Sequence, residues 1–186
     1  MWYSQYPESQ VLSKALTCAE FNCGTYSENP RGSYDVDPYE SYYNTPYEGV
    51  IDHQIPREDF SIKKRVLGVR IGDHERAYPY DLLEREFIVQ DEVNLIPVLV
   101  LFDASTETGL VYSRVLDGRV LNFTLDAKDH GIFRDEETKS IWQVVSGTAI
   151  GGPLKGAGLQ SIFATTAFEF GWYGYFPESS TYPETQ

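Results

Sequence analysis

The chain has 186 residues, enough for one domain of ordinary size with an additional arm. Its formal net charge is −13, which argues against a nucleic-acid binder and against docking on anionic lipid, because both need a basic surface. Aromatic residues make up 15% of the chain and most of them are Tyr, a residue common where a protein surface meets a partner. We therefore expect a protein partner or a homo-oligomer, with no nucleic acid.

No apolar run approaches the roughly 20 residues that a membrane-spanning helix needs. The N-terminal MWYSQYPESQ has neither the basic nor the apolar region of a signal peptide. These patterns predict no membrane span and no signal peptide in this sequence. Cys18 and Cys23 are the only cysteines, so they form a candidate disulfide, with free thiols or a metal site as the alternatives.

Residues 1–60 differ in composition from the rest of the chain. They contain YSENPRGSYDVDPYESYYNTPYEG, which is rich in Tyr, Pro, Gly, Ser and acidic residues and shows no sustained period of 2 or 3.6. This composition predicts an extended N-terminal arm, followed by a β domain over residues 61–186. The candidate partner-binding residues of the arm are its clustered tyrosines: Tyr34, Tyr39, Tyr42, Tyr43 and Tyr47.

From Arg65 onward, apolar and polar residues alternate. RVLGVRI (65–71) and ERAYPY (75–80) flank Gly72-Asp73, which predicts a hairpin, and YDLLERE (80–86) predicts a short helical turn after Pro79. Strands are also expected at FIVQD (87–91) and IPVLVLF (96–102). The second of these is apolar on both faces, so we expect it to be a central strand.

The second half of the β domain contains two further hairpin patterns. GLVYSRVL and RVLNFTL flank Asp117-Gly118, which supplies the positive φ angles of a type I′ turn, and GIFRD and SIWQVV flank EETK. Near the end, Phe168, Trp172 and Phe176 recur every four residues, which predicts a helix capped by Thr165 or Thr166. We interpret this aromatic stripe as a helix covering an open sheet, in preference to a ligand platform. The expected fold is mainly β, an antiparallel barrel-like or rolled sheet with one short C-terminal helix and the extended arm.

The segment from about residue 65 to 182 resembles a bacterial and archaeal family, domain of unknown function 3179. The matching stretches are VLGVRIGDHERAYPYDLL, YSRVLDGRVLNF, FRDEETKSIWQVVSGTAIGGPLKGAGL and FPESSTY, and DPYESYY in the arm is similar to the lead-in of one branch. The RAYP, DGR and DEET-S-W patterns are distinctive in order and spacing. The resemblance implies an exported or envelope-associated protein, but it implies no activity, because none is established for the family.

Many members of that family carry Tyr-Cys-Pro-Leu-Cys-Gly-Thr after the central strand and Trp-His-Glu after the helical turn. Such thiols and imidazole would suit a soft metal or thiol redox chemistry. In a gapless alignment the two cysteines fall on Asp103 and Thr106, within LFDASTETG, and the histidine falls on Glu86. Carboxylates bind hard ions but cannot replace thiolates, so the resemblance implies a domain that lacks the reactive thiols and imidazole of the family motif.

The sequence leaves three hypotheses for function. We favour a non-enzymatic structural or interaction protein, an envelope or extracellular accessory subunit that assembles through its Tyr-rich arm, with no predicted cofactor or metal. The second is a metal-dependent enzyme or redox module at a candidate acidic cluster, although the same residues also fit a solvated turn. The third is a small-ligand binding module built on the aromatic helix. The acidic cluster consists of Glu86, Asp103, Thr106 and Glu107.

Overall fold

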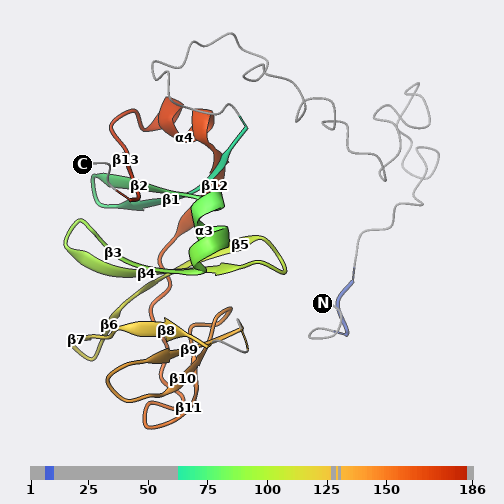
Figure 1. The fold of residues 1–186 in the computed structure, drawn as a ribbon, viewed down its shortest axis with the longest axis vertical. Coiled ribbons are helices and arrows are strands. Elements are labelled where there is room, and N and C mark those ends of the chain that lie inside the picture. Colours follow the sequence, from blue (N-terminus) through green and yellow to red (C-terminus); the bar gives the residue numbers. More distant parts are fainter. Residues whose placement is uncertain (1–6, 11–62, 127–128, 130, 184–186) are drawn as a thin grey trace. The chain divides into compact units, whose positions relative to one another are not determined.

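The computed structural model describes residues 7–10, 63–126, 129 and 131–183 of the chain (Figure 1). The chain divides into two compact units, Met1–Tyr47 and Glu48–Gln186. Residues 7–10 are the only described part of the first unit. Cys18, Cys23 and the five candidate partner-binding tyrosines lie outside the described residues. Within the described ranges, no helix is long and apolar enough to cross a membrane.

The second unit is mainly β, with strands in several mostly antiparallel sheets and two short helices (Figure 1). The first sheet has the order β12-β1-β2-β13, formed by Ala164–Phe168, Arg65–Ile71, His74–Pro79 and Ser180–Thr181. The central sheet is β3-β4-β5, formed by Ile88–Val93, Ile96–Asp103 and Thr108–Ser113. The third sheet is β11-β10-β9-β8, formed by Ala149–Gly151, Ile141–Gln143, Ile132–Asp135 and Phe123–Leu125.

Three smaller elements complete the unit. A two-stranded ribbon joins β6 (Val115–Leu116) to β7 (Arg119–Val120). The helices are α3 (Tyr80–Glu86) and α4 (Glu169–Tyr175). All strand pairs are antiparallel among the described residues except β13 with β2, which is parallel.

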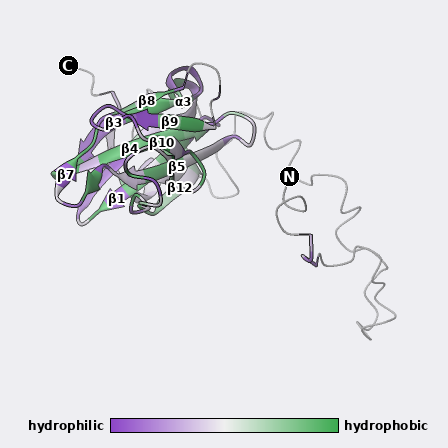
Figure 2. Cartoon of the chain, turned by 90° about the horizontal axis from the view of Figure 1, so that it is seen from below, coloured by the Kyte–Doolittle hydropathy of each residue, from purple (hydrophilic) through white to green (hydrophobic). Residues whose placement is uncertain are grey.

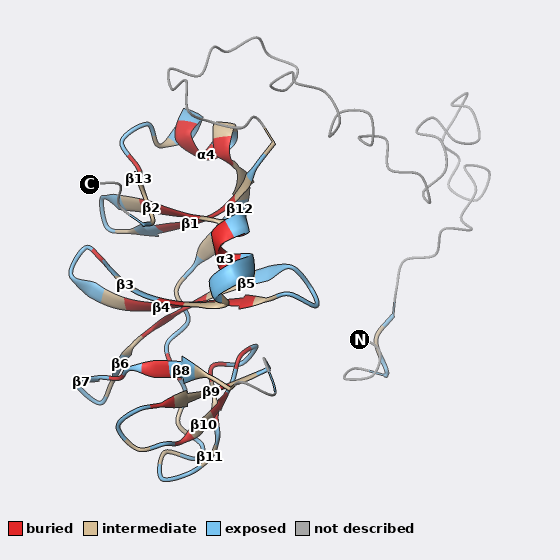
Figure 3. Ribbon diagram, in the orientation of Figure 1, coloured by how far each residue is buried: buried red, intermediate tan, exposed pale blue. Residues whose placement is uncertain are grey.

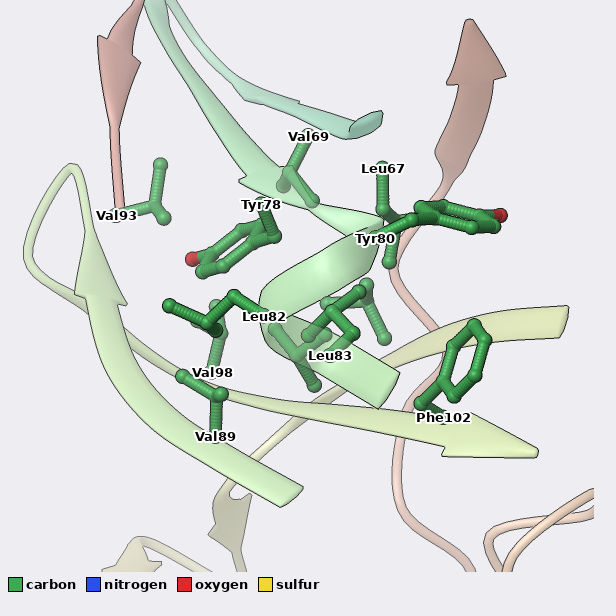
Figure 4. Close-up of a cluster of buried hydrophobic side chains, with 12 residues drawn as sticks. Leu67, Val69, Tyr78, Tyr80, Leu82, Leu83, Val89, Val93, Val98 and Phe102 are labelled. Carbon is green, nitrogen blue, oxygen red and sulfur yellow. The ribbon is translucent and has the colours of Figure 1, made fainter. Parts of the chain in front are cut away.

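Strand β4 is buried on both faces, as its apolar run predicts. Val98, Val100 and Phe102 belong to a hydrophobic cluster between the first and central sheets, which Figure 4 shows around α3. The alternate residues Leu99 and Leu101 belong to a second cluster, shared with the third sheet. The period of 2 along a strand therefore supplies both cores from one segment, and the strand is buried from Val98 to Phe102 (Figure 3).

The expectation of a barrel-like or rolled sheet is wrong, because the described residues form stacked sheets and no closed barrel. A strand that is apolar on both faces needs a cover on each side. The first sheet and α3 cover one face of β4, and the third sheet covers the other. Hydrophobic segments, drawn in green, run through several of the strands (Figure 2).

The three predicted hairpins are confirmed. Gly72 has a φ of 65° in the turn between β1 and β2, and Asp117 and Gly118 have φ angles of 49° and 74° between β6 and β7. These paired positive angles are those of the predicted type I′ turn. Strands β9 and β10 pair across the EETK segment, with Lys139 at a φ of 61°.

The C-terminal helix forms, but it begins later than the sequence predicts. Thr165 and Thr166 lie in β12, which pairs with β1, and α4 begins at Glu169 without a side-chain cap. Trp172 is only 6% exposed and packs against the first sheet in a cluster with Val66, Ala77 and Tyr173. Trp172 on α4 therefore covers the sheet, as expected, but Phe168 is the last residue of β12 and Phe176 follows the helix, so the three residues do not form a single helical stripe.

Candidate functional site

The family motif positions converge at one end of the central sheet, which we call the rim: Glu86, Asp103 and residues 104–107. Glu86 is the last residue of α3, and Asp103 is the last residue of β4. The backbone N–H of Phe102 donates to the carbonyl of Phe87 at 2.9 Å, which holds the end of the helix beside the end of the strand. Positions 86 and 103 thus lie at the same end of the sheet, where the resemblance implies an imidazole and a thiol.

Asp103 uses its carboxylate to close the turn that follows β4. Its Oδ1 accepts hydrogen bonds from the hydroxyl of Ser105 at 2.7 Å and from the backbone N–H of Ser105 at 2.8 Å. The Ser105 hydroxyl is the main cause that lowers the pKa of Asp103, and the carboxylate is therefore ionised at neutral pH. This geometry is that of an Asx-turn, in which an Asp side chain replaces a backbone acceptor.

Glu107 occupies a position that favours glycine. Its φ is 50°, and the gapless alignment places the glycine of the Cys-Pro-Leu-Cys-Gly motif here. The Glu107 carboxylate accepts a hydrogen bond from the Arg65 guanidinium at 2.7 Å, in an ion pair whose side chains are 60% and 39% exposed. Arg65 also lies 4.8 Å above the ring of Tyr80. Sequence reasoning did not identify Arg65, because 42 residues separate it from Glu107 and no local pattern links them.

The rim provides hydroxyl, carboxylate and guanidinium groups. In the described part of the chain, no group of three or more His, Cys, Asp or Glu residues is placed to hold a metal ion. Thr106 is exposed, and its carbonyl accepts from the Thr108 hydroxyl at 3.2 Å. These groups can exchange hydrogen bonds and ion pairs with a partner, but they offer no thiolate for redox chemistry.

The family pattern DEET-S-W builds a buried turn. Asp135 is fully buried, and its carboxylate accepts four hydrogen bonds. Oδ1 accepts from the backbone N–H of Thr138 at 2.5 Å. Oδ2 accepts from the Thr138 hydroxyl at 3.0 Å, the Ser140 backbone N–H at 3.0 Å and the Trp142 indole N–H at 2.9 Å. Burial raises the pKa of Asp135, but these hydrogen bonds outweigh it, so the pKa is lowered.

The glycine-rich stretch after this turn is also structural. The Ser140 hydroxyl accepts from the backbone N–H of Leu154 at 3.0 Å. Gly152 has a φ of 86°, and a Cβ there would lie 2.6 Å from the Ser140 Cα. A Cβ on Gly147 would lie 2.5 Å from the Tyr112 ring, whose hydroxyl donates to the carbonyl of Val144. The close approach of these segments therefore requires glycine.

The RAYP pattern organises a buried ion pair. The Arg76 Nε lies 2.5 Å from Oδ2 of Asp91, and the Tyr78 hydroxyl donates to the same oxygen at 3.0 Å. Burial, followed by the charge of Asp91, raises the pKa of Tyr78 well above its ordinary value. Arg76 also donates to the Ser180 hydroxyl at 3.2 Å, which links β2 to the FPESS segment. In that segment, the Ser179 hydroxyl accepts from the Trp172 indole at 2.8 Å.

Sequence reasoning recognised these patterns as family signatures but assigned no role to Asp135, Arg76 or Ser179. The spacing of Asp135 and Trp142 across a hairpin was the available signal, because it brings both side chains to one turn.

In comparisons with known proteins, no curated protein and no solved structure matches the chain. A family model described as "Protein of unknown function (DUF3179)" matches residues 1–179, which includes the N-terminal segment and most of the β domain. The chain therefore belongs to this family of proteins of unknown function.

Proposed function

We propose that this protein is a non-enzymatic structural or interaction protein. In this proposal it is an accessory subunit of the cell envelope or the extracellular space, and it assembles through its Tyr-rich arm with a protein partner or with further copies of itself. The observation that carries the proposal is the chemistry of the rim. Where the family motif has thiols and an imidazole, this chain has Asp103, Thr106 and Glu86, and the Asp103 carboxylate is engaged by Ser105.

The motif residues outside the rim add support, because their polar groups are engaged within the fold. Asp135 bonds to its own turn, Arg76 and Tyr78 bond to Asp91, and Ser179 bonds to Trp172. Catalytic groups need a reactive atom that faces a substrate, whereas the side chains of Asp135, Arg76, Tyr78 and Ser179 are buried and contact neighbours within the fold. We infer that these motif residues stabilise the fold and take no part in a reaction.

The arm provides the second line of support. Its tyrosines combine apolar area with a hydroxyl, which is the chemistry enriched in protein interfaces. A segment without a sustained hydrophobic period has little means of forming a core alone, and it can add a strand to the open edge of another sheet. The envelope or extracellular location is supported by the family resemblance alone.

Deletion of residues 1–45 tests the proposal. We expect the native mass, measured by size-exclusion chromatography with light scattering, to fall to that of a monomer when the full chain is an oligomer. For a heterologous partner, we expect the partner to be lost on purification. The far-ultraviolet circular dichroism of the β domain should persist. An unchanged mass and unchanged partner content would remove the arm from the account.

A matched pair of variants separates the side chains from the length of the arm. One variant replaces the clustered tyrosines with Ser, and the other replaces three tyrosines that precede them. We expect assembly to be lost in the first variant and retained in the second. Equal loss in both variants would contradict a specific role for the cluster. The first set is Tyr34, Tyr39, Tyr42, Tyr43 and Tyr47, and the second is Tyr3, Tyr6 and Tyr26.

A further inference from the structure

Two hairpin tips form a ridge at one edge of the β domain. The first tip is Gly72-Asp73, between β1 and β2, and the second is Asn94-Leu95, between β3 and β4. The Asn94 side chain donates to the carbonyl of Ile71 at 3.2 Å, which joins the two tips. Figure 1 shows both tips at the same edge of the molecule, and Figure 3 shows that they are exposed.

An apolar groove of about 600 Å³ lies on one side of this ridge. Its apolar lining comes from β1, the start of β4, β6 and the segment before β12: Ile71, Ile96, Val115 and Ile162. Arg70, whose guanidinium is paired with Glu75, also lines it. Ile96 and Val115 are each 39% exposed, and the neighbouring Val120, which pairs with Val115, is 47% exposed. The apolar surface therefore continues from the groove onto the β6–β7 ribbon.

Leu95 is the second residue of the turn between β3 and β4 and is 82% exposed, and it directly precedes Ile96, which lines the apolar groove. Its φ is 61° and that of Asn94 is 49°, the angles of a type I′ turn, in which the second position favours glycine. A leucine at positive φ costs conformational free energy, and an exposed leucine gains little from burial within the described residues. A strained, exposed apolar residue beside an apolar groove indicates a contact with another molecule.

A second groove, of about 370 Å³, lies on the other side of the ridge and is acidic. Its lining includes Asp73, Glu75, Glu92 and Glu178. Glu75 is paired with Arg70 at 2.9 Å, and the Asp73 carboxylate contacts the His74 ring nitrogen at 2.8 Å. Asp73, Glu92 and Glu178 are exposed, and Arg76, which is paired with Asp91, also lines the groove. With a formal net charge of −13, the whole chain attracts cationic partners and repels acidic ones.

We propose that this ridge docks a basic, apolar segment of a partner protein. An apolar side chain of the partner enters the first groove against Leu95, and Lys or Arg residues beside it face the carboxylates of the second groove. An extended segment of six residues spans about 20 Å, enough to cross a single hairpin tip. The charge of the ridge disfavours a second copy of this acidic chain, and the Tyr-rich segment with its Asp35, Asp37 and Glu40.

The experiment uses the full chain and measures the fluorescence anisotropy of labelled synthetic peptides. The probe is a decapeptide that alternates Leu and Lys, with two matched peptides that carry Glu in place of Lys or Ser in place of Leu. We expect the Leu–Lys peptide to bind, and the two matched peptides to bind at least tenfold more weakly. No binding of the Leu–Lys peptide, or equal binding of the Ser–Lys peptide, would overturn the proposal.

Variants of the chain locate the site. Leu95→Gly relieves the strain of the turn, so we expect it to raise the melting temperature and to weaken peptide binding at least fivefold. Val115→Asp should weaken binding at least tenfold. Val145→Asp, at a 63% exposed residue that lines neither groove, is the matched control and should leave binding unchanged.

Two results would contradict this assignment. One is a Leu95→Gly variant that is stabilised yet binds as tightly as the wild type. The other is a native mass that halves on Leu95→Gly substitution, because the groove would then be an interface between copies of this chain. The proposal does not depend on the arm, so its failure and the failure of the arm deletion are separate results.

Discussion

Replacing Asp135 with Asn should destabilise the protein strongly, although the two side chains have nearly the same size. The carboxylate is fully buried and accepts four hydrogen bonds, one at Oδ1 and three at Oδ2. An amide can place its oxygen at the Oδ2 position, and its NH₂ group then faces the N–H of Thr138. In the variant, none of these hydrogen bonds has a charged acceptor, and at least one donor is left without an acceptor. We expect a loss of about 2–4 kcal/mol in the free energy of unfolding, a large fraction of the roughly 5–15 kcal/mol of a typical domain.

Urea denaturation, followed by tryptophan fluorescence, measures this loss. The matched control is Asp117→Asn, because Asp117 is exposed and its positive φ is one that Asn adopts readily. We expect the control to change the free energy of unfolding by less than about 0.5 kcal/mol. A loss for Asp135→Asn as small as that of the control would refute the interpretation of the DEET-S-W pattern as a buried structural turn.

The pH dependence provides an independent check. The pKa of Asp135 is lower in the folded than in the unfolded protein, so folding favours the ionised form. The contribution of the Asp135 carboxylate to the free energy of unfolding is present above its pKa in the unfolded chain, about 3.9. This contribution is lost as the pH falls through the pKa of Asp135 in the folded protein. Below about pH 4, the wild type should therefore lose stability more steeply with falling pH than Asp135→Asn. If the free energy of unfolding changed with pH in the same way in the wild type and in Asp135→Asn, the ionised Asp135 carboxylate would not be what stabilises this turn.

Two further predictions concern backbone geometry. Glu107→Gly removes a strained φ together with an exposed ion pair to Arg65, so we expect it to be neutral or stabilising by up to about 1 kcal/mol, whereas Glu107→Ala keeps the strain and should destabilise. Equal effects of the two substitutions on chemical denaturation would argue against strain. Gly68→Ala should cost about 1–3 kcal/mol, because its Cβ would lie 2.1 Å from the Trp172 ring. Gly171→Ala, in open space on α4, should be neutral or stabilising by up to about 1 kcal/mol, and a similar loss at both positions would refute the packing argument.

The hairpins were predictable because their signals are local. Gly72 and Asp117-Gly118 specify turns within a few residues, and the uninterrupted apolar run of β4 indicates burial on both faces. The stacking of the sheets was not predictable in the same way. Strand β12 pairs with β1 across about one hundred residues, and nothing local distinguishes this edge strand from a helix start, so the sequence predicts Thr165 or Thr166 as a helix cap.

The rim was predictable only in part. The family resemblance locates Glu86 and Asp103 at one end of the sheet, and the structure brings α3 and β4 together there. The partner of Glu107 was not predictable, because Arg65 approaches it through tertiary packing of two sheets. The roles of the candidate acidic cluster, the two cysteines and the arm tyrosines stay predictions.

We propose that this protein acts by contact with other molecules and carries no reactive centre at the rim. Elemental analysis of the full chain, purified without added metal or chelator, tests it most directly. We expect less than one-tenth of a transition-metal ion per chain, with the same content in Asp103→Asn and Glu86→Gln. One tightly held copper, zinc or iron per chain, lost in either variant, would contradict the account.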